Sequence, residues 1–162
     1  MDLTIRRANE SDWPAIWALF QQVTAAGDTF AYDAETTELV ARKLWVDSPS
    51  MGYVAYEGES FLGTYFLRPN QPGRGAHVAN GGYMVCSDAR GKGIASKLCE
   101  HSIETARSLG FRAMQFNFVI STNTSAIHVW KKHGFRELGR IPNGFQHATL
   151  GYVDAIIFHR EL

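Results

Sequence analysis

Hydrophobic positions change their spacing several times along the chain, and each change predicts a new element. Apolar residues three and four positions apart indicate helices, whereas alternating or unbroken apolar runs indicate strands. Helices are expected from about Pro14 to Ala25 and over 35–45, 95–109 and 124–133. Strands are expected at about 3–6, 52–56, 61–67, 83–86, 113–120, 135–141 and 152–159. The order β-α-α-β-β-β-α-β-α-β-β predicts one mixed α/β domain over residues 1–162, with a central sheet of about seven strands and four helices.

Three details of this prediction concern the later strands. The last two strands are expected to flank a loop over Pro142–Phe145. Strict alternation in the strand over 113–120 would place Asn117 on one face with Gln115 and Val119, opposite Met114, Phe116 and Phe118. Asn80 precedes two glycines, so a bulge and a plain Asn-Gly turn are equal alternatives there.

Composition and charge narrow the range of partners. Hydrophobic residues make up 45% of the 162-residue chain, and sixteen basic residues balance sixteen acidic ones. No basic stripe is present, so no nucleic-acid partner is expected. No segment approaches the roughly 20 apolar residues of a membrane span, and the first residues lack a signal segment, so a cytoplasmic location without membrane association is expected. Cys86 and Cys99 lack metal-ligand spacing, which predicts packed thiols and no metal site.

The segment Arg90-Gly91-Lys92-Gly93-Ile94-Ala95 follows a predicted strand and begins a predicted helix. Its glycines allow a sharp turn that exposes backbone N–H groups, and the start of a helix carries a partial positive charge. Arg90 and Lys92 add two full charges. The segment therefore predicts a site for a diphosphate, such as that of a nucleotide-bearing cofactor.

Spacing distinguishes this segment from two common phosphate-binding loops. A dinucleotide-binding loop needs a third glycine, which is missing here, and a nucleoside-triphosphate loop needs Ser or Thr after Lys92, where Gly93 stands. The remaining pattern is Arg-x-x-Gly-x-Ala. From these six residues alone, a glycine-rich turn with two solvated basic side chains remains an open alternative.

A second segment, 123–135, supports the interpretation of residues 90–95 as a binding loop. It combines an N-cap candidate at Asn123, a short helix and a Gly134-Phe135 stop. Together the two segments resemble the coenzyme A motifs of the GCN5-related N-acetyltransferase (GNAT) superfamily, with Ala126 also in the matching position. The resemblance covers essentially the whole chain and implies a GNAT-like fold that binds acetyl-CoA as cosubstrate.

The resemblance also implies roles for individual residues. Arg90, Gly91, Lys92, Gly93, Ile94 and Ala95 would hold the pyrophosphate, Asn123 would face the pantetheine arm, and Met84 and Val85 would pair with that arm. The backbone N–H of Val85 would stabilise the oxyanion formed when an amine attacks the thioester.

One family position departs from its usual residue. The leaving thiolate commonly takes a proton from a Tyr, and Trp130 stands there instead. An indole N–H is too weak an acid for that role, so Trp130 is interpreted as an aromatic wall beside the acyl chain. His128 and His133, on the same predicted helix, are interpreted as surface side chains.

Two asparagines are the candidates for direct contact with the reacting groups. Asn is uncommon inside strands, yet Asn117 lies within a predicted strand. The span from Asn80 onward resembles a subgroup containing yeast acetyltransferases of proline analogues such as azetidine-2-carboxylate. That resemblance implies that Asn80 and Asn117 orient the substrate and stabilise the reacting carbonyl. The base remains open between water and a loop group such as Asp28.

The expected function is therefore transfer of an acetyl group to a small amine or amino acid, which includes toxic amino-acid analogues. The acceptor is expected near an aromatic loop, with Asp28, Phe30 and Tyr32 as substrate-binding candidates. A protein N-terminus is an alternative acceptor, and a non-catalytic acyl-CoA-binding module is an alternative of another class. The apolar final strand suggests a homodimer through its edge, by resemblance to related proteins.

Overall fold

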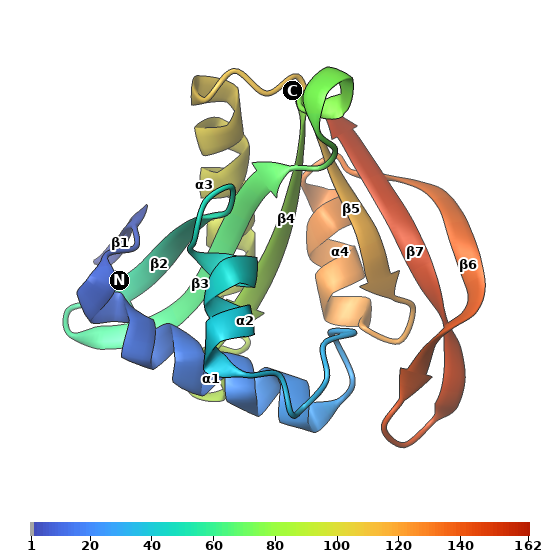
Figure 1. The fold of residues 1–162 in the computed structure, drawn as a ribbon, viewed down its shortest axis with the longest axis horizontal. Helices are drawn as coiled ribbons and strands as arrows, with labels where there is room; N and C mark the ends of the chain where they lie inside the picture. Colours follow the sequence, from blue (N-terminus) through green and yellow to red (C-terminus); the bar gives the residue numbers. More distant parts are fainter. Residues whose placement is uncertain (1) are drawn as a thin grey trace.

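The computed structural model describes residues 2–162 as a seven-stranded sheet with helices on both faces (Figure 1). The strands are β1 (Leu3–Arg7), β2 (Met51–Glu57), β3 (Ser60–Pro69), β4 (Val78–Val85), β5 (Ala113–Ile120), β6 (Arg136–His147) and β7 (Gly151–Glu161). The α-helices are α1 (Trp13–Ala26), α2 (Glu38–Trp45), α3 (Ile94–Ser108) and α4 (Thr124–Lys132). The predicted order of elements and the mixed α/β architecture are confirmed.

The sheet is divided by a splay between two parallel strands. Its order is β1-β2-β3-β4-β5-β7-β6, and every neighbouring pair is antiparallel except β4 and β5. These two strands share only the pairs Val78–Ala113 and Ala79–Met114. Beyond these pairs the strands diverge, and the wide end of the resulting V lies toward the bottom of Figure 1.

Each face of the sheet has its own hydrophobic core. Helices α1 and α2 cover one face, where Ile16, Phe20 and Trp45 pack on the sheet. Helix α3 covers the other face through side chains that include Leu98 and the fully buried Cys99. Because both faces are covered, the central strand β3 is buried without interruption from Leu62 to Leu67, which explains its unbroken apolar run. No helix within residues 2–162 is long and apolar enough to span a membrane.

Both cysteines are free thiols, as predicted. Burial raises the pKa of Cys99 to about 12, so this thiol is a packing group rather than a nucleophile.

The second helix begins later than the sequence pattern predicts. It starts at Glu38 rather than at residue 35, because Asp33 organises a turn that its side chain closes by accepting a hydrogen bond from the Glu35 N–H at 2.8 Å. Thr37 then caps the helix by accepting from the Val40 N–H.

Predictions for the later strands were wrong at several points. The segment Pro142–Phe145 lies inside β6 at a register irregularity, and the turn comes after His147. The final strand β7 is not an edge strand, since β6 occupies the edge. A bulge between Phe116 and Val119 breaks the alternation of β5, so Asn117 and Phe118 are both exposed. Asn80 lies in β4 in regular register with β3, at neither a bulge nor a turn.

Candidate active site

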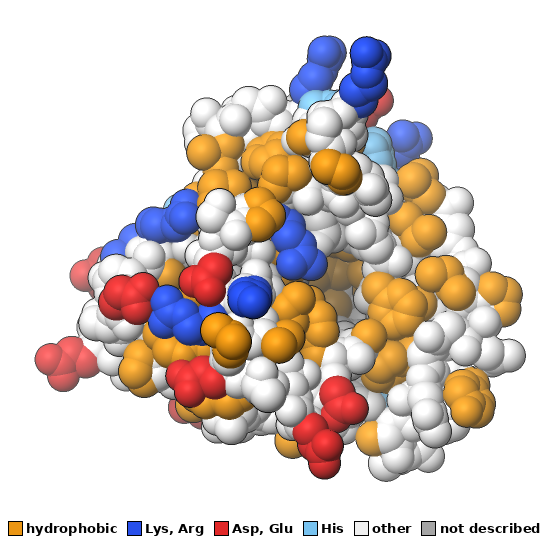
Figure 2. Space-filling view, in the orientation of Figure 1, with side chains coloured by type: hydrophobic (Ala, Val, Ile, Leu, Met, Phe, Trp, Pro, Cys, Tyr) orange, Lys and Arg blue, Asp and Glu red, His pale blue; other side chains and the backbone are white. Residues whose placement is uncertain are grey.

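The splay between β4 and β5 opens into a cavity of about 850 Å³. Figure 2 shows a hollow at this side of the molecule, framed mainly by hydrophobic side chains. The residues that line the cavity come from the α1–α2 loop, the end of β4, the start of α3, the start of α4 and the β6–β7 turn. Among them are Asp28, Phe30, Met84, Val85, Arg90, Gly91, Gly93, Ile94, Ala95, Asn123, His128, Trp130, His147 and Leu150.

The loop between β4 and α3 presents backbone donors to this cavity. Gly91 and Gly93 have φ of 75° and 77°, a region in which only glycine is unstrained, and no atom lies within 4 Å of where a side chain would begin. Gly93 is the N-cap of α3 and supplies no side-chain hydrogen bond to the first turn. The first N–H groups of α3 therefore lack partners within their own helix, and with the helix dipole they give this end of the cavity donors and a partial positive charge that suit an anion.

The backbone of β4 supplies one further donor. The Cys86 N–H donates to the Leu62 carbonyl of β3 at 2.9 Å. Successive N–H groups of a strand point to opposite edges, so the Val85 N–H points away from β3 into the splay. Within residues 2–162, no strand pairs with β4 at this position. The Val85 N–H therefore points toward the cavity, where it can donate to a bound group.

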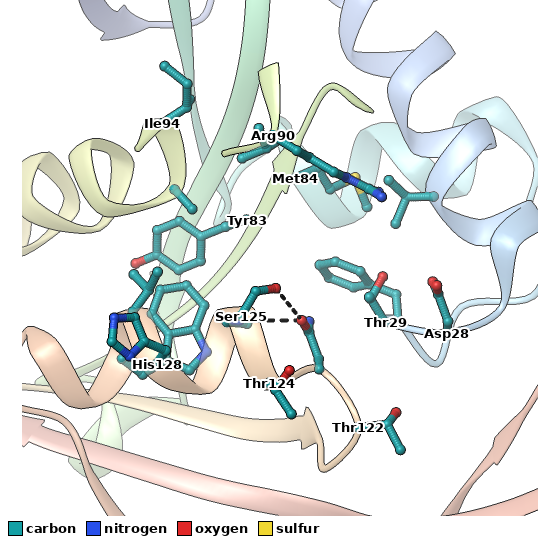
Figure 3. A pocket seen from close by; sticks show the side chains of 18 of the residues that line it. Asp28, Thr29, Tyr83, Met84, Arg90, Ile94, Thr122, Thr124, Ser125 and His128 are labelled. Carbon is teal, nitrogen blue, oxygen red and sulfur yellow. Dashed lines mark hydrogen bonds between the residues drawn. The ribbon is translucent and has the colours of Figure 1, made fainter. Parts of the chain in front are cut away.

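Asn123 lies across the cavity at the N-terminus of α4. Its Oδ1 accepts from the Ala126 N–H at 3.4 Å and from the Ser125 hydroxyl at 3.3 Å; the dashed lines near Ser125 in Figure 3 mark these bonds. These bonds fix the side chain as an N-cap and leave the Nδ2 donors available to a ligand.

Aromatic residues form the inner wall of the cavity. Trp130 is 7% exposed and packs against Tyr83 and Phe116, with ring centroids 4.7 and 4.8 Å apart. Its Nε1 is the one buried side-chain nitrogen or oxygen within residues 2–162 that has no hydrogen-bond partner. The Tyr83 hydroxyl bonds to Ser102 Oγ at 2.6 Å, and burial raises the pKa of Tyr83 well above its usual value. Tyr83 is therefore a poor proton donor, and the geometry supports a packing role for both rings.

Two histidines, His128 in α4 and His133 at the C-terminal cap of that helix, differ in their surroundings. His128 is exposed and lines the cavity, as Figure 3 shows. His133 is half-buried and its Nε2 shares a hydrogen bond with Ser96 Oγ at 2.7 Å. Burial lowers the pKa of His133, so its neutral form is favoured near pH 7.

Two loops meet at the outer end of the cavity. The Ala148 N–H donates to the Gly27 carbonyl at 2.9 Å, which ties the β6–β7 turn to the α1–α2 loop. A side chain at Gly27 would begin 3.0 Å from Ala148 Cβ, so the loops are in close contact. This connection, which we call the loop bridge, closes one side of the cavity.

His147, beside the loop bridge, is a cavity residue that sequence reasoning missed. Its Nδ1 accepts from the N–H groups of Thr149 and Leu150 at 3.1 and 3.2 Å, so the neutral ring carries its proton on Nε2. Nothing local in the sequence distinguishes this histidine, because its position follows from how the β6–β7 turn reaches the α1–α2 loop. Asp28, on the α1–α2 loop, is the one acidic side chain lining the cavity within residues 2–162.

Four of the predicted site residues do not line the cavity. Lys92 is exposed on the loop before α3, and Tyr32 stacks on Phe30 with centroids 5.6 Å apart. Asn80 donates through Nδ2 to the Gln115 carbonyl of β5 at 3.0 Å, one position beyond the last pair between β4 and β5. Asn117 accepts from the Gln115 amide at 3.0 Å and donates to Asn70 Oδ1 at 2.7 Å.

The two asparagines therefore belong to one group of amides, which comprises Asn70, Asn80, Gln115 and Asn117. This group bridges β4 and β5 at the narrow end of the splay. The structure thus brings Asn80 and Asn117 close together in the fold, at the junction of the two strands rather than along the cavity wall.

Comparisons with known proteins agree with this geometry. Residues 13–135 match the model of the Acetyltransferase (GNAT) family. The solved structure of a GCN5-related N-acetyltransferase from Kribbella flavida is 44% identical, with a TM-score of 0.94 over 99% of this chain and 98% of that one.

Two curated relatives add information on possible acceptors. The L-methionine sulfoximine/L-methionine sulfone acetyltransferase of Pseudomonas aeruginosa is 31% identical over 88% of this chain and 85% of its own length. The N-acetyltransferase aca1 of Schizosaccharomyces pombe is 38% identical over 61% of this chain, and the aligned region spans 48% of its length.

Proposed function

The chain belongs to the GNAT family of acetyl-CoA-dependent N-acetyltransferases, and we propose that its acceptor is the amine of a small molecule or amino acid. The loop bridge carries this proposal. Because the Ala148 N–H and the Gly27 carbonyl join two loops at the outer end of the cavity, an extended polypeptide would have to separate these loops to enter from that side. A compact amine would not.

The relatives support an amino-acid acceptor. The Pseudomonas enzyme is named for two methionine analogues, and it aligns with most of this chain. From the resemblance of the span from Asn80 onward to yeast acetyltransferases of proline analogues, we propose more narrowly that proline analogues such as azetidine-2-carboxylate are among the acceptors.

The reaction we propose is direct attack in a ternary complex. When bound, acetyl-CoA supplies the thioester, and the N–H groups at the start of α3 would hold its pyrophosphate. The neutral amine forms a bond to the thioester carbonyl carbon, and the Val85 N–H stabilises the oxyanion. The carbon–sulfur bond then breaks and the thiolate leaves. Because a thiol has a pKa of about 8.5, the thiolate can leave near neutral pH without a strong acid.

The remaining proton must leave the attacking amine. Asp28 lines the cavity and can accept it directly or through water, whereas the His147 Nδ1 already accepts two backbone hydrogen bonds. We propose that Asn117 and Asn80, at the narrow end of the splay, orient the acceptor and stabilise the reacting carbonyl of the thioester.

The test is a thiol-release assay with acetyl-CoA and a panel of amino acids, amines, polyamines and short peptides. We expect turnover with free amino acids at least about tenfold above turnover with tetrapeptides, since a well-formed pocket discriminates by one to a few kcal/mol. Faster turnover with peptides would indicate a protein N-terminus as the acceptor. Acetyl-CoA binding by calorimetry without turnover on any acceptor would indicate the non-catalytic binding module.

The Asn117→Ala variant tests the proposed role of that side chain. It should reduce turnover by about tenfold or more while the acetyl-CoA affinity stays within twofold, because Asn117 does not touch the cavity that would hold the cofactor. Asn117 is exposed, so the fold should be preserved. Unchanged turnover would remove the assignment.

We also propose that two copies associate through the edge strand β6. Leu138, Leu150 and Tyr152 are 58%, 62% and 65% exposed at this end of the sheet, and such side chains favour contact with another surface. Sedimentation of the purified protein would give the mass directly, and a monomer at micromolar concentration would contradict this proposal.

A further inference from the structure

Arg68 lies on the α1/α2 face of the sheet and has no anionic partner among residues 2–162. In β3, Thr64 accepts from the Trp45 indole of α2 at 2.9 Å, and Phe66 is buried in the same core. Side chains two positions apart share a face of a strand, so Arg68 extends over this face as well. Its guanidinium lies 4.6 Å from the centroid of the Phe66 ring.

The charge of Arg68 is incompletely satisfied by the protein. Arg68 is half-buried and takes part in no ion pair within residues 2–162. Its one hydrogen bond there is a long one, 3.4 Å to the Leu44 carbonyl. By contrast, the half-buried Arg42 is paired with Glu10 at 2.9 Å. A shielded guanidinium has five donors, so Arg68 retains capacity to bind a planar anion in bidentate fashion.

The surroundings of Arg68 connect it with the acceptor end of the cavity. Arg68 stands opposite Asn80 in the β3–β4 register, and Phe66 stands opposite Gly82. A side chain at Gly82 would begin 2.6 Å from the Phe66 ring and 3.4 Å from Phe30, which itself lines the cavity. The guanidinium and the cavity are therefore separated only by this small group of rings and the glycine backbone.

Tyr32 provides a second connection between the Arg68 guanidinium and the cavity. It stacks on Phe30, with centroids 5.6 Å apart. Burial raises the pKa of Tyr32, and the positive charge of Arg68 opposes this rise.

From this juxtaposition we propose that Arg68 binds the carboxylate of an α-amino acid acceptor, with Asn80 and Tyr32 beside it. This inference rests on the proposed function. The guanidinium lies over Phe66, which stands opposite Gly82, and three residues of β4, from Gly82 to Val85, span about 10 Å. An arginine–carboxylate contact, the single carbon between the carboxylate and the amine, and the contact of the thioester oxygen with Val85 together cover a distance of this order. An acceptor with its carboxylate at Arg68 would thus direct its amine along β4 toward the thioester at Val85.

The experiment compares acceptors that differ only in the carboxylate. L-methionine sulfone and azetidine-2-carboxylic acid are assayed beside their carboxamides, together with the amine panel, in the thiol-release assay. We expect the wild-type kcat/KM to be at least about 30-fold higher for the better acid than for its carboxamide, since charge-assisted bidentate bonds are lost in the carboxamide.

Three variants assign this preference to Arg68. Arg68→Gln should lower kcat/KM for the acid by about 30-fold and for the carboxamide by less than about threefold, and Arg68→Lys should fall between, because an ammonium lacks the planar fork. Arg74→Gln is the matched control, since Arg74 is exposed on the β3–β4 connection, and it should leave both values unchanged.

Each outcome decides a different point. If Arg68→Gln lowers kcat/KM equally for the acid and the carboxamide, Arg68 has a structural role and the proposal is overturned. It is also overturned if the best acceptors of the wild-type enzyme lack a carboxylate. Both results would leave the acetyltransferase assignment intact. If acetyl-CoA binds and no amine is acetylated, the proposed function is wrong and the role of Arg68 falls with it.

Discussion

The indole N–H of Trp130 has no hydrogen-bond partner within residues 2–162, which leads to a prediction about stability. In Trp130→Phe the buried donor disappears, and this gain offsets part of the lost ring contacts with Tyr83 and Phe116. The free energy of unfolding should therefore change by less than about 1.5 kcal/mol, whereas Trp130→Ala should cost about 3–5 kcal/mol. Urea unfolding measures both.

The same variant tests the catalytic role of the indole. If Trp130 is a wall, kcat of Trp130→Phe should stay within about threefold of wild type, because ring shape is largely kept. A fall of more than about tenfold at unchanged KM for acetyl-CoA would instead give the N–H a part in thiolate release.

Helix α3 supplies a prediction that separates fold from function. An acidic side chain in the first turn stabilises a helix through the dipole, but it also repels a phosphate bound there. Ala95→Asp, at the cavity-lining start of α3, should weaken acetyl-CoA binding by about tenfold or more and leave the melting temperature unchanged or higher.

Calorimetry and thermal unfolding measure the two effects. Ser108→Asp adds the same charge at the other end of the helix, about 20 Å away, and should leave the acetyl-CoA affinity as it is. Undiminished binding to Ala95→Asp would show that the pyrophosphate does not lie at the start of α3.

The arrangement of the whole molecule decides the size of the acceptor. Gly27 has φ of 63° and touches Ala148 in the loop bridge, whereas Gly58 has φ of 58° in the β2–β3 turn and touches nothing within 4 Å. Substitution of either residue by Ala should cost about 1–2 kcal/mol of backbone strain. Only Gly27→Ala should also displace the β6–β7 turn.

We therefore expect Gly27→Ala to raise KM for the acceptor by about threefold or more, with the acetyl-CoA affinity unchanged, and Gly58→Ala to alter stability alone. Steady-state kinetics on both variants provide the measurement. Equal acceptor KM values in the two variants would mean that the loop bridge does not shape the acceptor site.

Much of this arrangement was readable from local patterns. Helical spacing, caps and glycine stops are properties of neighbouring residues, so the order of elements and the loop at Arg90–Ala95 were predicted within a few residues. Local patterns failed where a contact distant in sequence overrides them. Alternation in β5 stops at the bulge near Asn117, and β6 continues through Pro142 because β7 pairs along it.

The glycine turn at residues 90–95 and the capped helix within 123–135 could be predicted because turn conformation and helix capping depend on side chains only a few positions apart. The positions of His147 and Arg68 near the cavity could not be predicted, since no motif in the neighbouring sequence distinguishes these residues. His147 reaches the cavity only when the β6–β7 turn meets the α1–α2 loop, and Arg68 lies near it only when β3 and β4 pair. Packing between distant segments decides which side chains lie together where the acceptor is proposed to bind. This packing lowers the free energy only in the folded chain, so neighbouring residues in the sequence carry no sign of it.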